Sequence, residues 1–386
     1  MRVFVFFLLF ITSTVPSFAW QLTPPDTIPG KKELVPFTIK LPKVAVAVRD
    51  SAKPAKNLLA FPFAVRSLET DWGFGGIFAR FFKAEKKDTT IRTSDINLLG
   101  LYTLRKQLIL VLSSTIFFPK EDHIARFQAS YSYYPDNFWG LGNHTLHTAN
   151  EGFKQKQYFI NPQFLKRIHG KFYLGLTYEF QHTGPVSYTP GGLFDQENIV
   201  GRYGGNTSGI GPILSWDTRN HAYSPDHGFF AEMTYVYFDQ HLGSNFNFRV
   251  FSVDLRKFIY LSKTSVLALQ GLGGFTGGNT PFRKLEELGG ADMMRGLYGG
   301  RFTDKCLMAY QAEYRRFLFW RVGMVGFASM GEVAPTPGRF ELDSFHYAYG
   351  GGVRFMLSKE EKLNLRLDYG VGKHSNAFTV QLREAF

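Results

Sequence analysis

The chain has 386 residues, with 44 Lys or Arg against 32 Asp or Glu and a formal net charge of +12. Its 17% aromatic content excludes a disordered chain, and its single cysteine, Cys306, excludes an intrachain disulfide framework and a thiolate zinc cluster. The basic residues are spread along the chain without the clustered stripe that nucleic-acid binding needs, so we expect no nucleic-acid partner.

The first segment, residues 1–19, has the features of a secretory signal peptide. It starts with the basic Arg2, continues in an apolar run and ends on the small residues Ser17 and Ala19. The run is shorter than the ~20 residues of a spanning helix, which disfavours the alternative of a retained anchor. Residues 20–56 are rich in proline and lysine, and we expect an extended periplasmic arm, either a solvated linker or a segment that binds a partner.

From about residue 57 onward, apolar and polar residues alternate with a period of two. Leu363, Leu365 and Leu367, for example, interleave with Asn364 and Arg366. Successive side chains of a strand point to opposite faces, so each segment reads as a strand with one apolar side. We expect sixteen strands, at 57–68, 72–83, 91–104, 106–119, 122–135, 153–167, 170–183, 206–218, 228–240, 244–258, 263–277, 303–318, 321–332, 343–357, 362–372 and 376–386.

Strand length, aromatic placement and loop pattern favour a membrane barrel over a soluble sandwich. The strands have ten or more residues, against the usual ~5–6 of soluble proteins. Aromatic residues gather at strand ends, and the long connections 136–152, 184–205, 278–302 and 333–342 all fall on one side. The sequence therefore predicts an all-β fold: a 16-stranded antiparallel transmembrane β-barrel over residues 57–386, in the outer membrane of a Gram-negative bacterium.

Short motifs at strand ends resemble those of a known family. They are Thr70-Asp71-Trp72-Gly73-Phe74-Gly75-Gly76, Tyr134-Pro135-Asp136-Asn137-Phe138-Trp139-Gly140-Leu141-Gly142-Asn143, Trp216-Asp217-Thr218-Arg219 and Met294-Arg295-Gly296-Leu297-Tyr298. In their order and loop placement they resemble the barrel of the BamA/TamA-type outer-membrane assembly superfamily, the bacterial surface antigen family. The family's periplasmic polypeptide-transport-associated domains have no counterpart in residues 20–56.

The resemblance implies that the loop carrying Arg295 and Gly296 folds back into the lumen. Leu297 replaces the family's aromatic residue, and Tyr298 follows it. By parity Glu313 points inward and matches the family's acidic partner for the arginine, whereas Ser329 stands where the second acid is usual. We therefore expect a partly hydrated Arg295–Glu313 pair; the alternative is a solvated loop arginine.

Both ends of the predicted barrel carry a distinctive residue. Pro62 in the first strand fits a sheet edge, because proline has no N–H to donate; a wedge at a strand start is the alternative. Phe386 ends the last strand, and we place it on the same face as Phe378, Val380 and Leu382. The resemblance makes such a terminal aromatic strand a targeting signal, although Glu384 departs from the usual hydrophobic residue.

Catalytic and metal-binding motifs do not emerge from the sequence. Ser208 lacks the upstream glycine of a nucleophile elbow, which disfavours an esterase barrel. His144 and His147 have no third ligand nearby, as a zinc site would need. We expect no enzyme activity and no cofactor.

The leading functional hypothesis is that the barrel assists outer-membrane protein assembly or translocation through a seam between its first and last strands. Periplasmic assembly factors, client barrels and outer-membrane lipids are the expected partners. The alternative is a passive channel or a structural barrel that handles no client, with a polar lumen that conducts ions.

Overall fold

The computed structural model describes residues 58–84, 91–221, 224–358 and 362–386. The expected signal peptide at 1–19 and arm at 20–56 lie outside the described residues. Within the described ranges, no helix is long and apolar enough to cross a membrane.

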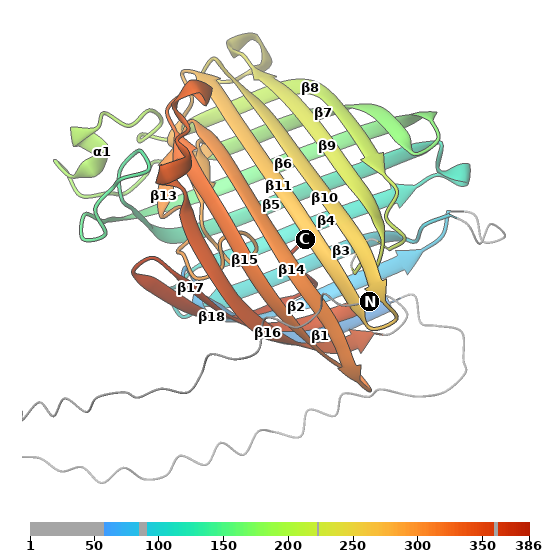
Figure 1. Ribbon diagram of the computed structural model, residues 1–386. Coiled ribbons are helices and arrows are strands. Elements are labelled where there is room, and N and C mark those ends of the chain that lie inside the picture. Colours follow the sequence, from blue (N-terminus) through green and yellow to red (C-terminus); the bar gives the residue numbers. More distant parts are fainter. Residues whose placement is uncertain (1–57, 85–90, 222–223, 359–361) are drawn as a thin grey trace, which may run out of the picture. The chain divides into compact units, whose positions relative to one another are not determined.

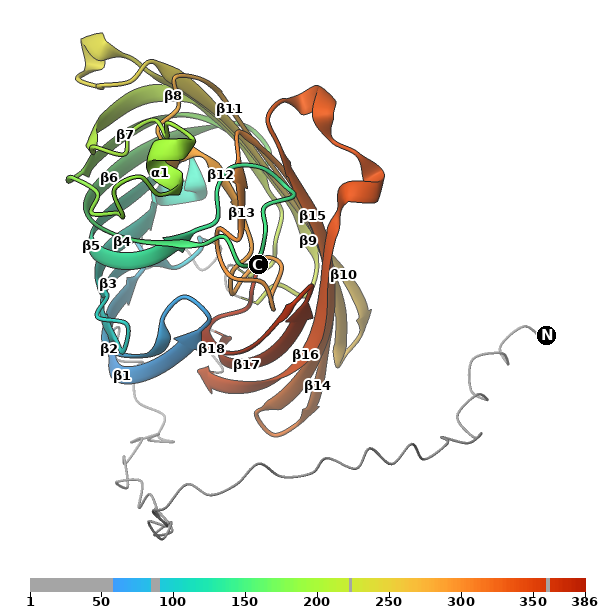
Figure 2. The same ribbon diagram turned by 90° about the vertical axis from the view of Figure 1, so that its left-hand side faces the viewer.

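Sixteen strands form one closed antiparallel barrel, as the sequence predicts (Figures 1 and 2). Each strand pairs with its neighbours in the chain, except that β11 pairs with β14 and β1 closes the barrel against β18. The barrel strands are β1 Leu58–Ser67, β2 Asp71–Phe82, β3 Ser94–Thr103, β4 Leu108–Phe117, β5 His123–Phe138, β6 Glu151–His169, β7 Phe172–Thr183, β8 Gly205–Asp217, β9 Gly228–Phe238, β10 Phe248–Ser262, β11 Ser265–Gly278, β14 Cys306–Phe319, β15 Val322–Ala334, β16 His346–Ser358, β17 Leu363–Gly372 and β18 Ser375–Leu382.

The remaining elements lie in the connections. They are the hairpin strands β12 Glu286–Leu288 and β13 Phe302–Asp304, the helix α1 Leu193–Gln196 and the 3-10 turns Pro119–Glu121, Gln240–Leu242, Phe282–Lys284, Pro337–Arg339 and Leu342–Ser344. The long connections 139–150, 184–204, 279–305 and 335–345 share one end of the barrel, which we call the long-loop end. The opposite end is the short-turn end.

The two faces of each strand differ in the way the period-two pattern predicts. On β7, Tyr173 and Thr177 are buried inside the barrel, whereas Leu174 and Leu176 point outward and are 44% and 60% exposed. Large apolar side chains on the outside of a closed sheet suit a hydrocarbon surround, because only there does their exposure cost nothing.

Several predicted strand boundaries lie three or four residues from the observed ones, and three of these differences have a clear local reason. β10 begins at Phe248 instead of 244, because Asp239 and Ser244 hold a tight turn through bonds to nearby main-chain groups. Residues 302–304 pair with 286–288 instead of starting the next barrel strand. The last strand ends at Leu382 instead of 386, and Arg383 adopts a left-handed φ of 72° that turns the chain off the sheet.

Inward-facing apolar residues form a cluster at the short-turn end of β4–β8. Ile91, from the connection between β2 and β3, inserts into it. The adjoining Arg92 donates hydrogen bonds to the Glu121 carboxylate from its main-chain N–H and its guanidinium. Its guanidinium also donates to the Asp217 carboxylate, at 2.6 Å. The other members of the cluster are Phe117, Ile124, Leu165, Tyr173 and Ile213. Residues 91 and 92, just before β3, are thereby fixed across the interior of the barrel to the end of β8.

Neighbouring residues on β5 test the inside–outside assignment. Phe127 points outward opposite Pro162, near the middle of the wall, and Gln128 points into the lumen and is exposed there. We expect Phe127→Arg to lower the free energy of unfolding by roughly 2–4 kcal/mol in a bilayer, because it places a charge near the midplane. Gln128→Arg should cost far less. Unfolding in urea, followed by the heat-modifiable mobility of the barrel on gels, measures both; equal losses would contradict the assignment.

Candidate functional site

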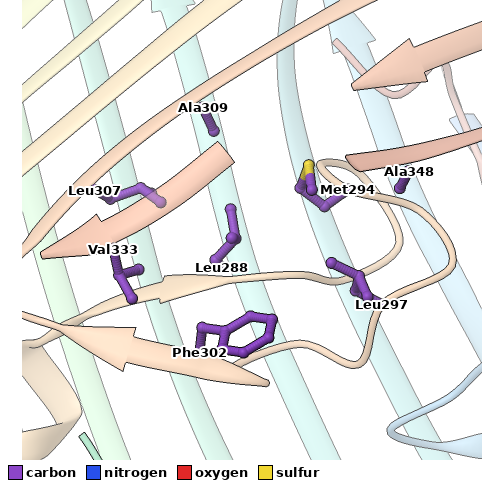
Figure 3. Packing of buried hydrophobic residues seen from close by; sticks show 8 residues of the cluster. All are labelled: Leu288, Met294, Leu297, Phe302, Leu307, Ala309, Val333 and Ala348. Atoms are coloured by element: carbon purple, nitrogen blue, oxygen red, sulfur yellow. The ribbon is translucent and has the colours of Figure 1, made fainter. Parts of the chain in front are cut away.

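The connection between β11 and β14, residues 279–305, folds into the barrel, and we call it the lumenal loop. Its apolar side chains pack against inward-facing residues of β14, β15 and β16 (Figure 3). Leu288, Met294, Leu297 and Phe302 come from the loop, and Leu307, Ala309, Val333 and Ala348 from the barrel wall. This packing holds the loop at the depth where its arginine meets the wall.

Arg295 lies at the centre of the packed loop and is 1% exposed. Its guanidinium forms ion pairs with Glu313 on β14 and with Asp368 on β17, the latter at 2.9 Å. The carbon of the guanidinium lies 3.6 Å from the ring centre of Phe327 on β15. A buried cation needs such partners, because an uncompensated charge in an apolar setting costs several kcal/mol.

Both carboxylates that hold Arg295 are shared with a second arginine. Glu313 also accepts from Arg315 Nε at 2.7 Å, and Asp368 also pairs with Arg354 on β16. Glu384, which follows β18, accepts from Arg354 Nε at 2.7 Å and from the Asn364 amide. The charges therefore form one network that joins the lumenal loop, the three barrel strands β14, β16 and β17, and the C-terminal residues.

The residues after Arg295 fix the loop further. Gly296 has a φ of 112°, and a Cβ there would lie 2.7 Å from the Gly370 and Val371 backbone, so only glycine fits. The Tyr298 hydroxyl donates to Asp136 on β5 at 2.7 Å. Burial and the nearby Asp136 carboxylate raise the pKa of Tyr298, which keeps the hydroxyl a neutral donor.

Two expectations about the loop need correction. Ser329 faces inward but donates to the Ala348 carbonyl, and it does not contact Arg295. The second acid is present after all: Asp368 supplies it from β17, so the pair is buried instead of partly hydrated. Asp368 shares its inward parity with Asn364 and Arg366 in the sequence, and this alternation was the available signal.

The expected placement of Phe386 was wrong. Because the chain leaves the sheet at Arg383, Phe386 is buried inside the barrel against Phe258 instead of standing on the outward face of β18. Its main-chain oxygen accepts from Arg315 at 3.0 Å. Pro62 lies within β1, opposite Gly76 of β2, in one of the two strands that close the barrel.

The closure between β1 and β18 is much shorter than the other strand pairings. In the described residues, Arg66 and Val380 are its one registered pair, whereas β1 pairs with β2 over ten residues and β17 with β18 over eight. We call this closure the seam. The lumenal loop touches both of its sides, since Gly299 donates to Glu69 in the β1–β2 turn and Ser375 of β18 donates to the Gly296 carbonyl.

Metal binding has no support from these groups. Within the part of the chain that the structure describes, no three His, Cys, Asp or Glu side chains gather in a way that could hold a metal ion.

Comparisons with known proteins agree with this architecture. A family model described as the Omp85 superfamily domain matches residues 112–382. No curated protein matches the sequence.

Solved barrels share the fold at low identity. BamA from Haemophilus ducreyi lacking POTRA domains 1-3 has a TM-score of 0.56 at 14% identity, over 85% of this chain and 70% of that one. CdiB from Acinetobacter baumannii has a TM-score of 0.56 at 12% identity, over 85% of this chain and 59% of that one. CdiB from Escherichia coli has a TM-score of 0.58 at 9% identity, over 86% of this chain and 63% of that one. This chain thus spans less than two thirds of either CdiB chain.

The sharing of carboxylates predicts unequal costs for the two halves of the central pair. Glu313→Ala should lower the free energy of unfolding by about 3–5 kcal/mol, because it leaves two buried arginines short of a partner. Arg295→Ala should cost less, since Glu313 and Asp368 each keep a second arginine. The double variant should be close to Glu313→Ala alone. Urea unfolding and protease cleavage of the lumenal loop measure these effects.

The control for this series is an ion pair in the same loop. The Arg283 guanidinium lies 3.2 Å from the Glu287 carboxylate on a more exposed stretch of the loop. Glu287→Ala should therefore lower the free energy of unfolding by less than ~1 kcal/mol. Simple addition of the two single losses in the Arg295/Glu313 double variant would contradict the shared network.

Proposed function

Because the chain belongs to the Omp85 superfamily, we propose that it is an outer-membrane barrel that assists the assembly or translocation of outer-membrane polypeptides through its seam. The short-turn end faces the periplasm and the long loops face outward, the usual asymmetry of such barrels. The mechanism is physical: an open sheet edge offers unpaired N–H and C=O groups to an incoming strand.

The observation that carries this proposal is the single registered pair at the seam. β18 has eight residues, and the chain then turns inward at Arg383, so residues 383–386 do not extend β18 alongside the first residues of β1. The exposed side chains of Leu58 and Pro62 mark this part of β1. Few ladder bonds must break to open such a seam, whereas each of the other neighbouring strand pairs in the described barrel has at least seven registered pairs.

The lumenal loop gives the seam one fixed side. Its charge network contacts β14, β16 and β17 through ion pairs that involve Glu313, Arg354 and Asp368. On the other side, a bond from the Gly299 N–H to the Glu69 carboxylate holds the loop to the β1–β2 turn. We infer that opening moves β1 and β2 while the strands β14–β18 stay in place.

A disulfide across the seam tests the proposal. In a Cys306→Ser background, Arg66→Cys and Val380→Cys place two cysteines at the registered pair. The control, Leu367→Cys with Val380→Cys, joins β17 to β18 and leaves the seam free. We expect the seam disulfide to abolish co-purification of unfolded outer-membrane polypeptides from membranes of the source bacterium, and reduction to restore it.

The outcomes separate assembly from passive conduction. Client polypeptides or periplasmic factors that co-purify with the free and control proteins, but not with the seam-locked protein, support the proposal. No co-purifying polypeptide in any state, together with ion conductance in planar bilayers that the seam disulfide leaves unchanged, would identify a passive channel instead.

A further inference from the structure

The outward face of β6 carries charges only at the two edges of its apolar stretch. Lys156 and Lys166 are exposed and ten positions apart, about the length of a membrane-crossing strand. The outward residues between them are Tyr158, Ile160, Pro162 and Phe164. Lys156 therefore lies at the level of the outer lipid headgroups, and Lys166 at the level of the inner ones.

Further cations gather around Lys156 at the long-loop end. Lys154 is two positions higher on the same outward face, where Glu151, Phe153 and Gln155 alternate with it toward the interior. The β3–β4 turn adds Arg105 and Lys106, both exposed.

Strand register brings the turn close to the lysines. Lys154 is opposite Pro135 of β5, and the carbonyl of Pro135 accepts from Gln107, the residue after Lys106, at 3.0 Å. Two strand spacings of about 4.8 Å thus separate the Lys154 backbone from the turn, within the reach of lysine and arginine side chains. We call Lys154, Lys156, Arg105 and Lys106 the rim cluster.

The rim cluster stands apart from acidic side chains in the described part of the chain. Among the residues that the structure describes, no carboxylate is within ion-pair distance of any of its four cations. The buried lumenal arginines Arg295, Arg315, Arg354 and Arg366, by contrast, each have a carboxylate partner. Unpaired cations that face the membrane at headgroup depth find their counter-charge in the lipid, because only lipid reaches that surface.

Aromatic side chains lie directly below these cations. Tyr131 and Tyr158 are opposite each other on β5 and β6, and their ring centres are 5.0 Å apart. Tyrosine at the boundary between acyl chains and headgroups presents an apolar ring and a polar hydroxyl to a sugar. The rim cluster is broad enough for a headgroup with more than one phosphate.

We propose that the rim cluster binds the phosphorylated sugar headgroup of an outer-leaflet glycolipid, the chemical class of lipopolysaccharide. The site depends on the orientation given under the proposed function, with the long loops outside. It does not depend on any assembly activity, so the failure of either proposal leaves the other open to its own test.

Titration of the purified barrel with bisphosphorylated lipid A in detergent, followed by native mass spectrometry, tests the site. Lys154→Gln with Lys156→Gln should weaken binding about thirty-fold, because each cation near an anionic lipid surface contributes about fivefold. The control, Lys166→Gln with Arg249→Gln, removes the same charge from outward positions elsewhere and should change binding less than about twofold. Unchanged heat-modifiable mobility shows that the variants are folded.

Further variants and lipids test whether the positive charge of the cluster recognises the phosphates of the headgroup. Lys154→Arg with Lys156→Arg should retain binding, and dephosphorylated lipid A should bind the wild-type protein much more weakly. Equal losses in the test and control variants, or no loss in either, would overturn the proposal. So would equally tight binding of phosphatidylglycerol with the same dependence on Lys154 and Lys156, which would indicate a general anionic surface.

Discussion

The interior of this barrel depends on the cost of burying one guanidinium. Arg295 is held inside the wall, away from bulk water, and such a charge is tolerated only when carboxylates surround it. Its two acids come from strands that are not neighbours, β14 and β17, so the position of the loop and the packing of that wall are determined together. Each acid also serves a second arginine, and the requirement for partners extends to Glu384 beyond the last strand. Ion pairs consequently link β14, β16 and β17 to the lumenal loop and to the C-terminal residues.

Charge is distributed differently on the two faces of the sheet. Inside, the arginines of the central network are buried beside carboxylates, as Arg354 is beside Asp368; outside, cations stand at the edges of the apolar stretch, as Lys156 and Lys166 do on β6. A cation on the lipid face costs roughly 2–4 kcal/mol at the midplane and little near the interfaces, which accounts for this pattern. The same rule keeps the seam free of charge except at its long-loop edge, where Arg66 pairs with Asp71.

The sequence predicts the fold well because its main signal is local. The alternation of apolar and polar residues on each strand indicates which side of the strand is apolar. Sixteen such strands, joined by short and long loops in turn, are consistent with a closed barrel. The partner of Arg295 was only half predictable. Glu313 followed from its inward parity together with the family resemblance, but nothing local distinguishes Asp368 on β17 from an acid on β15, because the choice depends on how far the loop crosses the lumen. Phe386 was misplaced because Arg383 takes a left-handed conformation that alternation does not report.

The position of Asp368 also orders the events of folding. The lumenal loop and β14 precede β17 in the chain, so Arg295 can find Glu313 early, but its second acid arrives only with the last hairpin. Arg66 and Phe378, which bond across the seam, are 312 residues apart, the kind of distant contact that chains form late. A barrel whose last hairpin is missing or misregistered would keep a half-neutralised arginine in its lumen. Completion of the barrel and stable seating of the loop are thus one event, and an unfinished barrel is marked by a loop that proteases can reach.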